Sequence, residues 1–369
     1  MLHAKKILKS TGEQFQIPGT WVDATPYGTG HINDTYLVKW QVNGTPVATI
    51  QQRINHVIFK NPPQLMDNIL RVTVHLQKKF HGIPHANPDQ EILTVIPTRN
   101  GASYYHDPDG NFWRMYVFVR NAKTVDICTH PLQAYEAARA FGNFQAKLAD
   151  LPGGRLHDTI PYFHHTSRRF QTLEDAINKD THNRCAAVRK EIDFCLAHQP
   201  LAAMITRLIE IGQMPERITH NDTKINNVMI DNRTGHGICV IDLDTVMSGC
   251  VLYDFGDMVR TMPRTAEEDE KDLNKVALDI ALFDSLTKGY LEEARSFLIP
   301  IETDHLVASG RVITFTIGIR FLTDYLQGDV YFKTHRPHQN LDRAHVQFKM
   351  IASMEQQEAA MNSVVRKYV

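Results

Sequence analysis

Three polar side chains have the types and spacing that phosphoryl transfer requires. Asp222 and Asn227 lie five positions apart in the segment THNDTKINN, residues 219–227, and Asp242 follows the apolar run ICVI at residues 238–241. One carboxylate beside one amide oxygen suits Mg²⁺, which prefers oxygen ligands and keeps waters and substrate phosphates as the rest. A second carboxylate is then left to face a hydroxyl acceptor. We therefore predict Asp222 as the catalytic base and Asn227 and Asp242 as Mg²⁺ ligands.

A predicted β-hairpin brings the two metal ligands together. Its turn, if centred on Thr234-Gly235, would place Asn227 opposite Asp242 on the paired strands. Taken alone, Asp222 is more simply an Asx turn and Asp242 a strand-end cap. The three residues together match the Asp-to-Asn spacing of kinase catalytic loops, and this favours a site for a metal and a nucleotide.

Other polar residues near these segments have supporting roles in the prediction. Asp244 is either a second metal ligand or a helper of Asp242. Residues 254–257 read DFGD and so contain the D-F-G of kinases, but they lie beyond the hairpin rather than at its end. We expect Asp254 and Asp257 to brace the loop by hydrogen bonding to its backbone. The adjacent His164 and His165 complete no metal-ligand spacing, and we expect a surface or loop pair.

The N-terminal part contains a glycine pair that suits phosphate binding. Gly28 and Gly30 form a G-x-G between two predicted strands, where backbone N–H groups can approach phosphates. A plain glycine turn is an equally good interpretation. Arg53 ends the third strand, on which kinases place a phosphate-pairing lysine, and a guanidinium also clamps phosphate. The alternative for Arg53 is a solvated arginine at a strand end.

The elements that position these residues form a β-rich part and a helical part. Strands are predicted at residues 21–26, 35–42, 46–53, 91–97 and 112–119, and a helix at 65–80. Later helices are predicted at residues 131–151, 183–211, 265–297, 303–326 and 342–368, with the acid-rich run 267–270 in a first helical turn. The sequence thus predicts an α+β fold with one domain at residues 1–120 and another at 121–369.

Composition excludes several classes of protein. The chain has 369 residues, with 40 Lys plus Arg against 41 Asp plus Glu, so it is not a generally basic nucleic-acid-binding protein. Its longest apolar runs are too short to span a bilayer, and its first residues lack the apolar segment of a signal peptide. Five cysteines without a C-x-x-C pattern indicate reduced thiols. We expect a cytoplasmic protein without a membrane or nucleic-acid partner.

Six segments of the chain resemble the aminoglycoside phosphotransferase/choline kinase family, which has a two-lobed, protein-kinase-like fold. They are GTGHINDTYLV (28–38), QQRINHVIFKNP (51–62), THNDTKINNVMID (219–231), CVIDLDTVMSG (239–249), YDFGDMVR (253–260) and GIRFLTDYLQGDVYFK (318–333). The last two resemble more narrowly the bacterial N-acetylhexosamine 1-kinases. The resemblance implies a β-rich N-terminal lobe that binds the nucleotide and a mainly helical C-terminal lobe that binds the acceptor.

This resemblance implies substrate-binding roles that spacing alone does not assign. Arg320 and Tyr331 match positions at which the sugar kinases contact their sugar. His31, in the glycine-containing loop, is implied to approach the acceptor as well. Without the resemblance, Arg320 and Asp324 are an i,i+4 pair of the kind that often only supports a helix surface.

The resemblance also implies how ATP is held. Val117 and Val119 belong to the stretch 117–121, which matches the hinge that meets adenine. The Lys–Glu ion pair of protein kinases is missing, because the predicted helix at residues 65–80 has no Glu and Arg53 stands where the Lys would be. The phosphate contacts are therefore expected to differ from those of protein kinases.

Taken together, the resemblance implies an ATP-dependent, Mg²⁺-requiring kinase that phosphorylates the anomeric C1 hydroxyl of an N-acetylhexosamine, GlcNAc or GalNAc. The partner is a small sugar, and the chain is expected to be a monomer or a weak homodimer. Two alternatives stay open. The first is a kinase of the same superfamily that acts on an aminoglycoside, choline or homoserine, and the second is a non-catalytic kinase-like binding protein.

Overall fold

The computed structural model describes residues 2–28, 30, 32–81, 83 and 86–369, and it divides the chain into two compact units. The sheet unit consists of Met1–Lys123, Asp150–Pro161 and Met229–Met247. The helical unit consists of Thr124–Ala149, Tyr162–Val228 and Ser248–Val369. Two later segments of the chain, one of them beyond its midpoint, therefore belong to the sheet unit.

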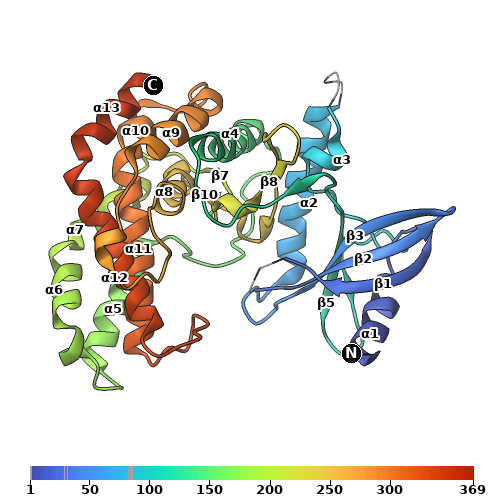
Figure 1. Cartoon of the computed structure of the whole chain (residues 1–369), viewed down its shortest axis with the longest axis horizontal. Coiled ribbons are helices and arrows are strands. Elements are labelled where there is room, and N and C mark those ends of the chain that lie inside the picture. Colours follow the sequence, from blue (N-terminus) through green and yellow to red (C-terminus); the bar gives the residue numbers. More distant parts are fainter. Residues whose placement is uncertain (1, 29, 31, 82, 84–85) are drawn as a thin grey trace. The chain divides into compact units, whose positions relative to one another are not determined.

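The sheet unit is built on a five-stranded antiparallel sheet in the order β1-β2-β3-β5-β4 (Figure 1). Its strands are β1 (Thr20–Pro26), β2 (Asp34–Val42), β3 (Thr45–Ile54), β4 (Tyr105–His106) and β5 (Phe112–Val117). Asn43 and Gly44 connect β2 to β3 with φ values of 48° and 82°, the left-handed conformation that such tight hairpins require. The predicted strands at residues 21–26, 35–42 and 46–53 are confirmed.

Helices cover the sheet and supply the rest of this core. α1 (Leu2–Gly12), which the sequence pattern did not predict, contributes Leu8 to a cluster with Val38 and Trp40. α2 (Pro62–Phe80) buries Leu65, Ile69, Val72 and Leu76 along one face, as the helical spacing predicts. Residues 91–97 do not form the predicted strand, because Pro88 begins the short helix α3 (Pro88–Glu91) and only Val95 bridges to β5.

A second small sheet carries the predicted hairpin. β6 (Ala122–Lys123), β8 (Val228–Asp231) and β9 (Gly237–Val240) lie in the order β6-β8-β9. The Asp231 N–H donates to the His236 carbonyl at 2.9 Å, and Gly235 has a φ of 75°. The turn is therefore centred one residue earlier than predicted, because Gly235 supplies the positive φ at its end rather than at its centre. This register does not place residue 242 opposite residue 227.

The helical unit contains most of the helices. They are α4 (Pro131–Leu148), α5 (Thr166–Lys179), α6 (Arg189–Ala197), α7 (Gln199–Glu210), α8 (Val251–Thr261), α9 (Ile280–Ala294), α10 (Pro300–Asp304), α11 (Leu306–Leu326), α12 (Gln339–Gln356) and α13 (Glu358–Tyr368). Short strands β7 (Arg217–Thr219) and β10 (Met247–Gly249) and single turns η1 (Cys185–Val188), η2 (Ile225–Asn227), η3 (Leu243–Thr245) and η4 (Leu273–Lys275) complete the chain. The α+β fold predicted from the sequence is confirmed.

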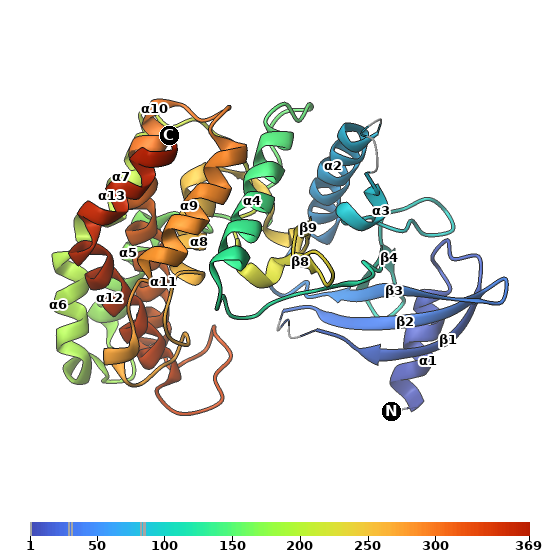
Figure 2. The same ribbon diagram turned by 45° about the horizontal axis from the view of Figure 1, so that its top comes forward.

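α11 is the central helix of this unit, with α5, α8 and α12 packed around it (Figure 2). It is long and apolar enough to cross a membrane by composition alone, yet 83% of its most apolar window is buried inside the fold. That degree of burial is typical of a core helix. Close packing requires Gly256 of α8, because a Cβ there would lie 2.5 Å from the Ser309 carbonyl oxygen of α11.

The acid-rich run at residues 267–270 does not form the predicted helical turn. It lies in a loop, because Arg264 bridges to Leu278 and the Thr265 hydroxyl donates to backbone carbonyls of Lys275 and Ala277. These contacts close the loop before α9 begins. The helix instead begins after Asp279, whose carboxylate accepts from the first backbone N–H groups of α9.

Candidate active site

The predicted catalytic loop places Asp222 and Asn227 side by side in the helical unit. The Asn227 side-chain amide donates to the Asp222 carbonyl at 2.7 Å and to its carboxylate at 3.1 Å. Lys224 Nζ lies 3.1 Å from the same carboxylate. Since both donor contacts of Asn227 go to Asp222, the remaining polar atom of the Asn227 side chain is its oxygen, the atom that ligates Mg²⁺.

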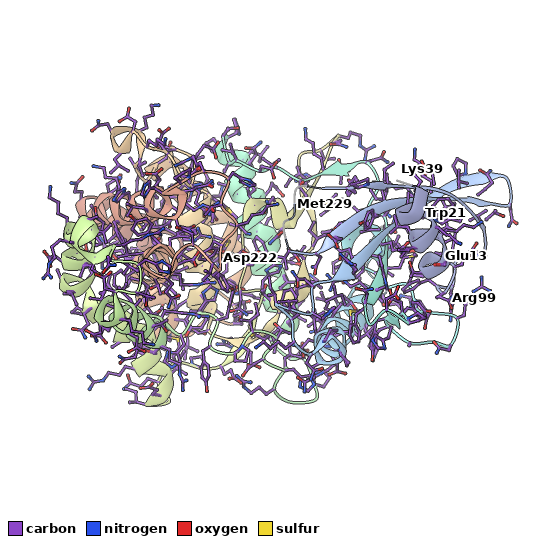
Figure 3. The ribbon with its side chains drawn as sticks, turned by 90° about the horizontal axis from the view of Figure 1, so that it is seen from below. Glu13, Trp21, Lys39, Arg99, Asp222 and Met229 are labelled. Carbon is purple, nitrogen blue, oxygen red and sulfur yellow. The ribbon has the colours of Figure 1, made fainter. Side chains whose placement is uncertain are left out.

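Asp222 is held as a carboxylate. Burial opposes its ionisation, yet the positive charge of Lys224 and the neighbouring His220, together with Arg260, lower the pKa of Asp222 below its ordinary value. A quarter of the side chain, 26%, stays exposed, so an acceptor hydroxyl can reach it. Asp222 can therefore accept a hydrogen bond from a hydroxyl and take its proton at neutral pH. Figure 3 labels its position.

Asp254 fixes the backbone of this loop, as predicted. Its carboxylate accepts from the backbone N–H of His220 at 2.8 Å and of Asn221 at 2.6 Å, and its carbonyl accepts from the Thr223 hydroxyl. Gln145 of α4 donates to the same carboxylate at 2.6 Å. Burial raises the pKa of Asp254 to about 6, and the N–H donors oppose that rise.

His164 holds the loop from the other side. Asn221 has a φ of 66°, a left-handed conformation that costs free energy outside glycine. The His164 Nε2 lies 2.8 Å from the Asn221 carbonyl oxygen, so Nε2 carries the proton and donates. His164 is only 4% exposed, and burial lowers its pKa to about 4. His164 therefore lies in a loop, as predicted, but is not on the surface, and His165 caps α5.

Asp257 does not bind the loop backbone as predicted. Its carboxylate accepts from Arg260 Nε at 2.8 Å, and Arg260 also lies 3.2 Å from Glu268. All three belong to the helical unit, and Asp257 and Arg260 are buried. Asp257 and Glu268 are therefore the carboxylate partners of Arg260. The positive charge of Arg260 also helps to lower the pKa of Asp222.

Arg320 and Tyr331 are brought together at the end of α11. An Arg320 amino group lies 3.4 Å from the Tyr331 hydroxyl, and the guanidinium lies 5.3–5.6 Å from the ring centres of Phe163, Tyr331 and Phe332. Asp324 does not pair with Arg320. Its carboxylate instead accepts the backbone N–H groups of residues 330, 331 and 332, at 2.7–2.9 Å, and so builds the turn that presents Tyr331.

In the sheet unit, Asp244 pairs with a buried arginine and with the glycine-containing loop. One carboxylate oxygen accepts from Arg114 at 2.5 Å and the other from Asn33 at 2.7 Å. Asp242, in the same unit, has a φ of 58° and contributes to the raised pKa of Arg114. Arg114 is 1% exposed and also donates to Gln52. The sequence pattern did not reveal Arg114, because its partner lies 130 positions away.

The glycine-containing loop joins this network through Asn33. Gly28 has a φ of 79°, a conformation that favours glycine, and no atom of the described residues lies within 4 Å of the Cβ position at Gly28 or Gly30. His31 lies outside the described residues. Arg53 pairs with Asp34 across the β2–β3 register at 2.5–2.8 Å and is about half exposed.

The predicted hinge follows β5. The Val117 backbone N–H donates to the Thr94 carbonyl at 2.9 Å. Val119 is buried, and within the described part of the chain its own backbone N–H and carbonyl have no hydrogen-bond partner. Tyr27, next to Gly28, stacks edge-on against Phe118 at 5.8 Å. The start of the glycine loop therefore lies against the segment that is predicted to meet adenine.

A pocket elsewhere in the sheet unit does not belong to this site. Its volume is about 380 Å³, and it is lined by Glu13, Gln14, Phe15, Ile17, Gly19, Trp40 and Arg99. Arg99 donates to the Glu13 carbonyl at 2.7 Å, and Figure 3 shows the two residues side by side. None of the predicted site residues lines it.

Comparison with known proteins gives a family and a set of related folds. The model of the Phosphotransferase enzyme family matches residues 23–281, well over half of the chain. The microcompartment-associated aminopropanol kinase is similar with a TM-score of 0.58 at 15% identity, over 96% of this chain and 98% of that one. Choline kinase from Cryptosporidium parvum Iowa II gives 0.58 at 14% identity, over 98% and 99%. Spectinomycin phosphotransferase, solved with ADP and spectinomycin, gives 0.54 at 13% identity, over 96% and 98%.

Proposed function

The chain belongs to the phosphotransferase enzyme family, and from that premise we propose that it transfers the γ-phosphoryl group of ATP to the C1 hydroxyl of an N-acetylhexosamine. The observation that carries the proposal is the catalytic loop, in which Asp222 stays ionised beside Asn227. A carboxylate of this kind orients an acceptor hydroxyl and takes its proton. The anomeric hydroxyl is more acidic than an ordinary alcohol, so the proton can be transferred late.

The proposed nucleotide contacts come from the sheet unit. Gly28 and Gly30 would offer backbone N–H groups to the phosphates, Arg53 a cation, and Val117 and Val119 the hinge for adenine. Two observations support them, the positive φ of Gly28 and the contact of Tyr27 with Phe118. The related spectinomycin phosphotransferase was solved with ADP, in keeping with ATP as the phosphoryl donor here.

Mg²⁺ is the proposed metal ion, with Asn227 and Asp242 as its protein ligands. The donor set fits, because the Asn227 amide uses its N–H groups on Asp222 and offers its oxygen, and Asp242 supplies a carboxylate. When bound, Mg²⁺ would neutralise charge on the β- and γ-phosphates of ATP. Asp244 is left out of the proposed set, because its two oxygens already accept from Arg114 and Asn33.

The proposed acceptor contacts are Arg320, Tyr331 and His31. Arg320 is flanked by aromatic rings, and it offers donors to the neutral hydroxyl and carbonyl groups of a sugar. A cationic acceptor such as choline or an aminoglycoside would need acidic groups at this end instead. Choline kinase, aminopropanol kinase and spectinomycin phosphotransferase share the fold at 13–15% identity, which does not decide the acceptor.

A substrate panel tests the proposal. The purified protein is given MgATP with GlcNAc, GalNAc, an aminoglycoside, choline or homoserine, and ADP release is measured. We expect turnover on GlcNAc or GalNAc, with ³¹P and ¹³C NMR showing phosphate on C1. Faster turnover on choline or an aminoglycoside would overturn the sugar assignment while leaving the phosphotransferase family intact.

A further inference from the structure

A second arginine lies beside Arg320 in the helical unit. Arg169 is at the fourth residue of α5, and its Nη2 donates to the Phe163 carbonyl at 3.3 Å. The Phe163 ring in turn lies against the Arg320 guanidinium at 5.4 Å. The Thr166 and Thr316 hydroxyls join α5 to α11 at 2.8 Å, and each arginine follows its threonine by one helical turn on the same face.

Neither of these two arginines forms an ion pair with a described residue. Among the described residues, no carboxylate lies within 4 Å of either guanidinium. Arg260, by contrast, is paired with Asp257 and Glu268. Burial, and after it the like charge of Arg320, lower the pKa of Arg169.

Arg169 also has an unused hydrogen-bond donor. Its Nε is buried and has no partner in the described part of the chain. Buried donors in folded proteins are nearly always satisfied, so this Nε is available to an oxygen of a bound molecule. Two adjacent guanidinium groups present planar arrays of N–H donors, which match the oxygens of a carboxylate or an amide carbonyl.

We propose that Arg169 and Arg320 together form a subsite for an acyl oxygen of the acceptor, an amide carbonyl or a carboxylate, and that this subsite excludes ammonium groups. The assignment rests on the proposed function, because it places the subsite at the acceptor end of a kinase. Arg169 is then a specificity-determining residue. The acetamido group of an N-acetylhexosamine supplies such an oxygen, whereas choline and aminoalcohols supply a cation in its place.

The subsite predicts a ranking among hexoses that differ in one substituent. GlcNAc carries an amide carbonyl at C2, glucose a hydroxyl and glucosamine an ammonium group, while glucuronate carries a carboxylate at C6. We expect kcat/KM to fall from GlcNAc to glucose and to fall further to glucosamine. The loss of one charge-assisted hydrogen bond is worth about 10- to 100-fold, and the ammonium group adds repulsion.

Variants of Arg169 test which residue reads the acyl oxygen. R169M should lower kcat/KM for GlcNAc about 10- to 100-fold through KM, change glucose less than threefold and leave the KM for ATP unchanged. R169K keeps the charge but not the planar fork, so it should recover part of the loss. R168M is the matched control, because Arg168 is the preceding residue of α5 and stacks on Tyr162 at 3.6 Å.

The outcomes separate this inference from the proposed function. Equal losses on GlcNAc and glucose in R169M, or turnover of glucosamine equal to that of GlcNAc, would overturn the subsite. To separate the two further, glycerate and ethanolamine are added as non-sugar acceptors with opposite charge. Turnover of glycerate but of no hexose, with loss in R169M, would overturn the sugar assignment and support the subsite. Preferred turnover of ethanolamine would overturn both.

Discussion

Arg114 of the sheet unit and the Arg169–Arg320 pair of the helical unit have opposite surroundings. In the sheet unit, Arg114 donates to Asp244 and Gln52, and its carboxylate partner is also held by Asn33. In the helical unit, Arg320 and Arg169 contact aromatic rings and a carbonyl oxygen but no carboxylate among the described residues. An arginine whose partners all come from the protein stabilises the fold. An arginine that the protein leaves without a counter-charge is available to a ligand.

The largest effect is expected where the protein leaves a carboxylate for the substrate. D222N keeps the side-chain shape but removes the base, so kcat should fall about 10²- to 10⁴-fold. The affinity for ATP, measured by calorimetric titration, should stay within about twofold because Asp222 is proposed to face the acceptor and not the nucleotide. D175N is a surface control on α5. Unchanged turnover in D222N would end the assignment of Asp222 as the base.

The next effect tests the arginine whose partners are internal. R114M leaves the Asp244 carboxylate buried without its main partner, and unfolding should become easier by about 3–5 kcal/mol in urea titrations. The double variant R114M/D244N should recover part of the loss, because no isolated charge remains. R320M should lower the unfolding free energy less than R114M does, and it should weaken acceptor binding more. Equal stability losses in R114M and R320M would contradict the distinction between an arginine paired within the protein and one available to a ligand.

A pH effect of intermediate size is expected at His164. Its folded pKa is about 4 against an ordinary value of 6.5, so the unfolded chain binds more protons between these values. Stability from this group is full above pH 6.5 and is lost as the pH falls towards 4, by up to about 3 kcal/mol.

H164Q isolates that contribution. Glutamine keeps a donor for the Asn221 carbonyl and does not titrate, so the difference in unfolding free energy between wild type and H164Q should shrink as the pH falls from 6.5 to 4. Asp254 titrates in an overlapping range in both proteins, and its contribution cancels in the difference. A difference that does not change with pH would show that folding does not lower the pKa of His164.

The smallest effect on stability is expected at Arg53. Its pair with Asp34 is about half exposed, and such pairs contribute less than about 1 kcal/mol. If Arg53 meets the ATP phosphates as proposed, R53A should raise the KM for ATP about tenfold. D34A removes the same ion pair but keeps the Arg53 cation, so it should leave the KM for ATP unchanged. An equal rise of the KM for ATP in R53A and D34A would show that the ion pair, and not the Arg53 cation itself, is responsible.

Local sequence patterns predicted what is decided locally. Asn43-Gly44 predicted its hairpin, the apolar spacing of residues 65–76 predicted the buried face of α2, and Asp254 was expected to brace the loop. The acid-rich run at 267–270 was misread, because a bridge between Arg264 and Leu278 closes that loop. The residue types within the run favour a helix, and they carry no information about a contact between residues 14 positions apart.

The missed residues share one property, which is that their partners are distant in sequence. Arg114 meets Asp244 130 positions later, and His164 meets Asn221 57 positions later. Arg169 and Arg320 are brought together only by the packing of α5 on α11. No pattern within one segment reveals such pairs, and only the unusual sequence Phe163-His164-His165 offered a local signal.

The turn built by Asp324 has a consequence for how this enzyme can change. The buried Asp324 carboxylate on the core helix α11 accepts hydrogen bonds from three successive backbone N–H groups. The position of Tyr331 is therefore fixed by α11 and not by contacts within its own segment. The turn that carries Tyr331, a proposed acceptor contact, can therefore exchange residues without disturbing the proposed catalytic loop, because Asp254 and His164 hold that loop by separate contacts. Such a separation lets mutation alter the choice of acceptor while the machinery of phosphoryl transfer stays the same.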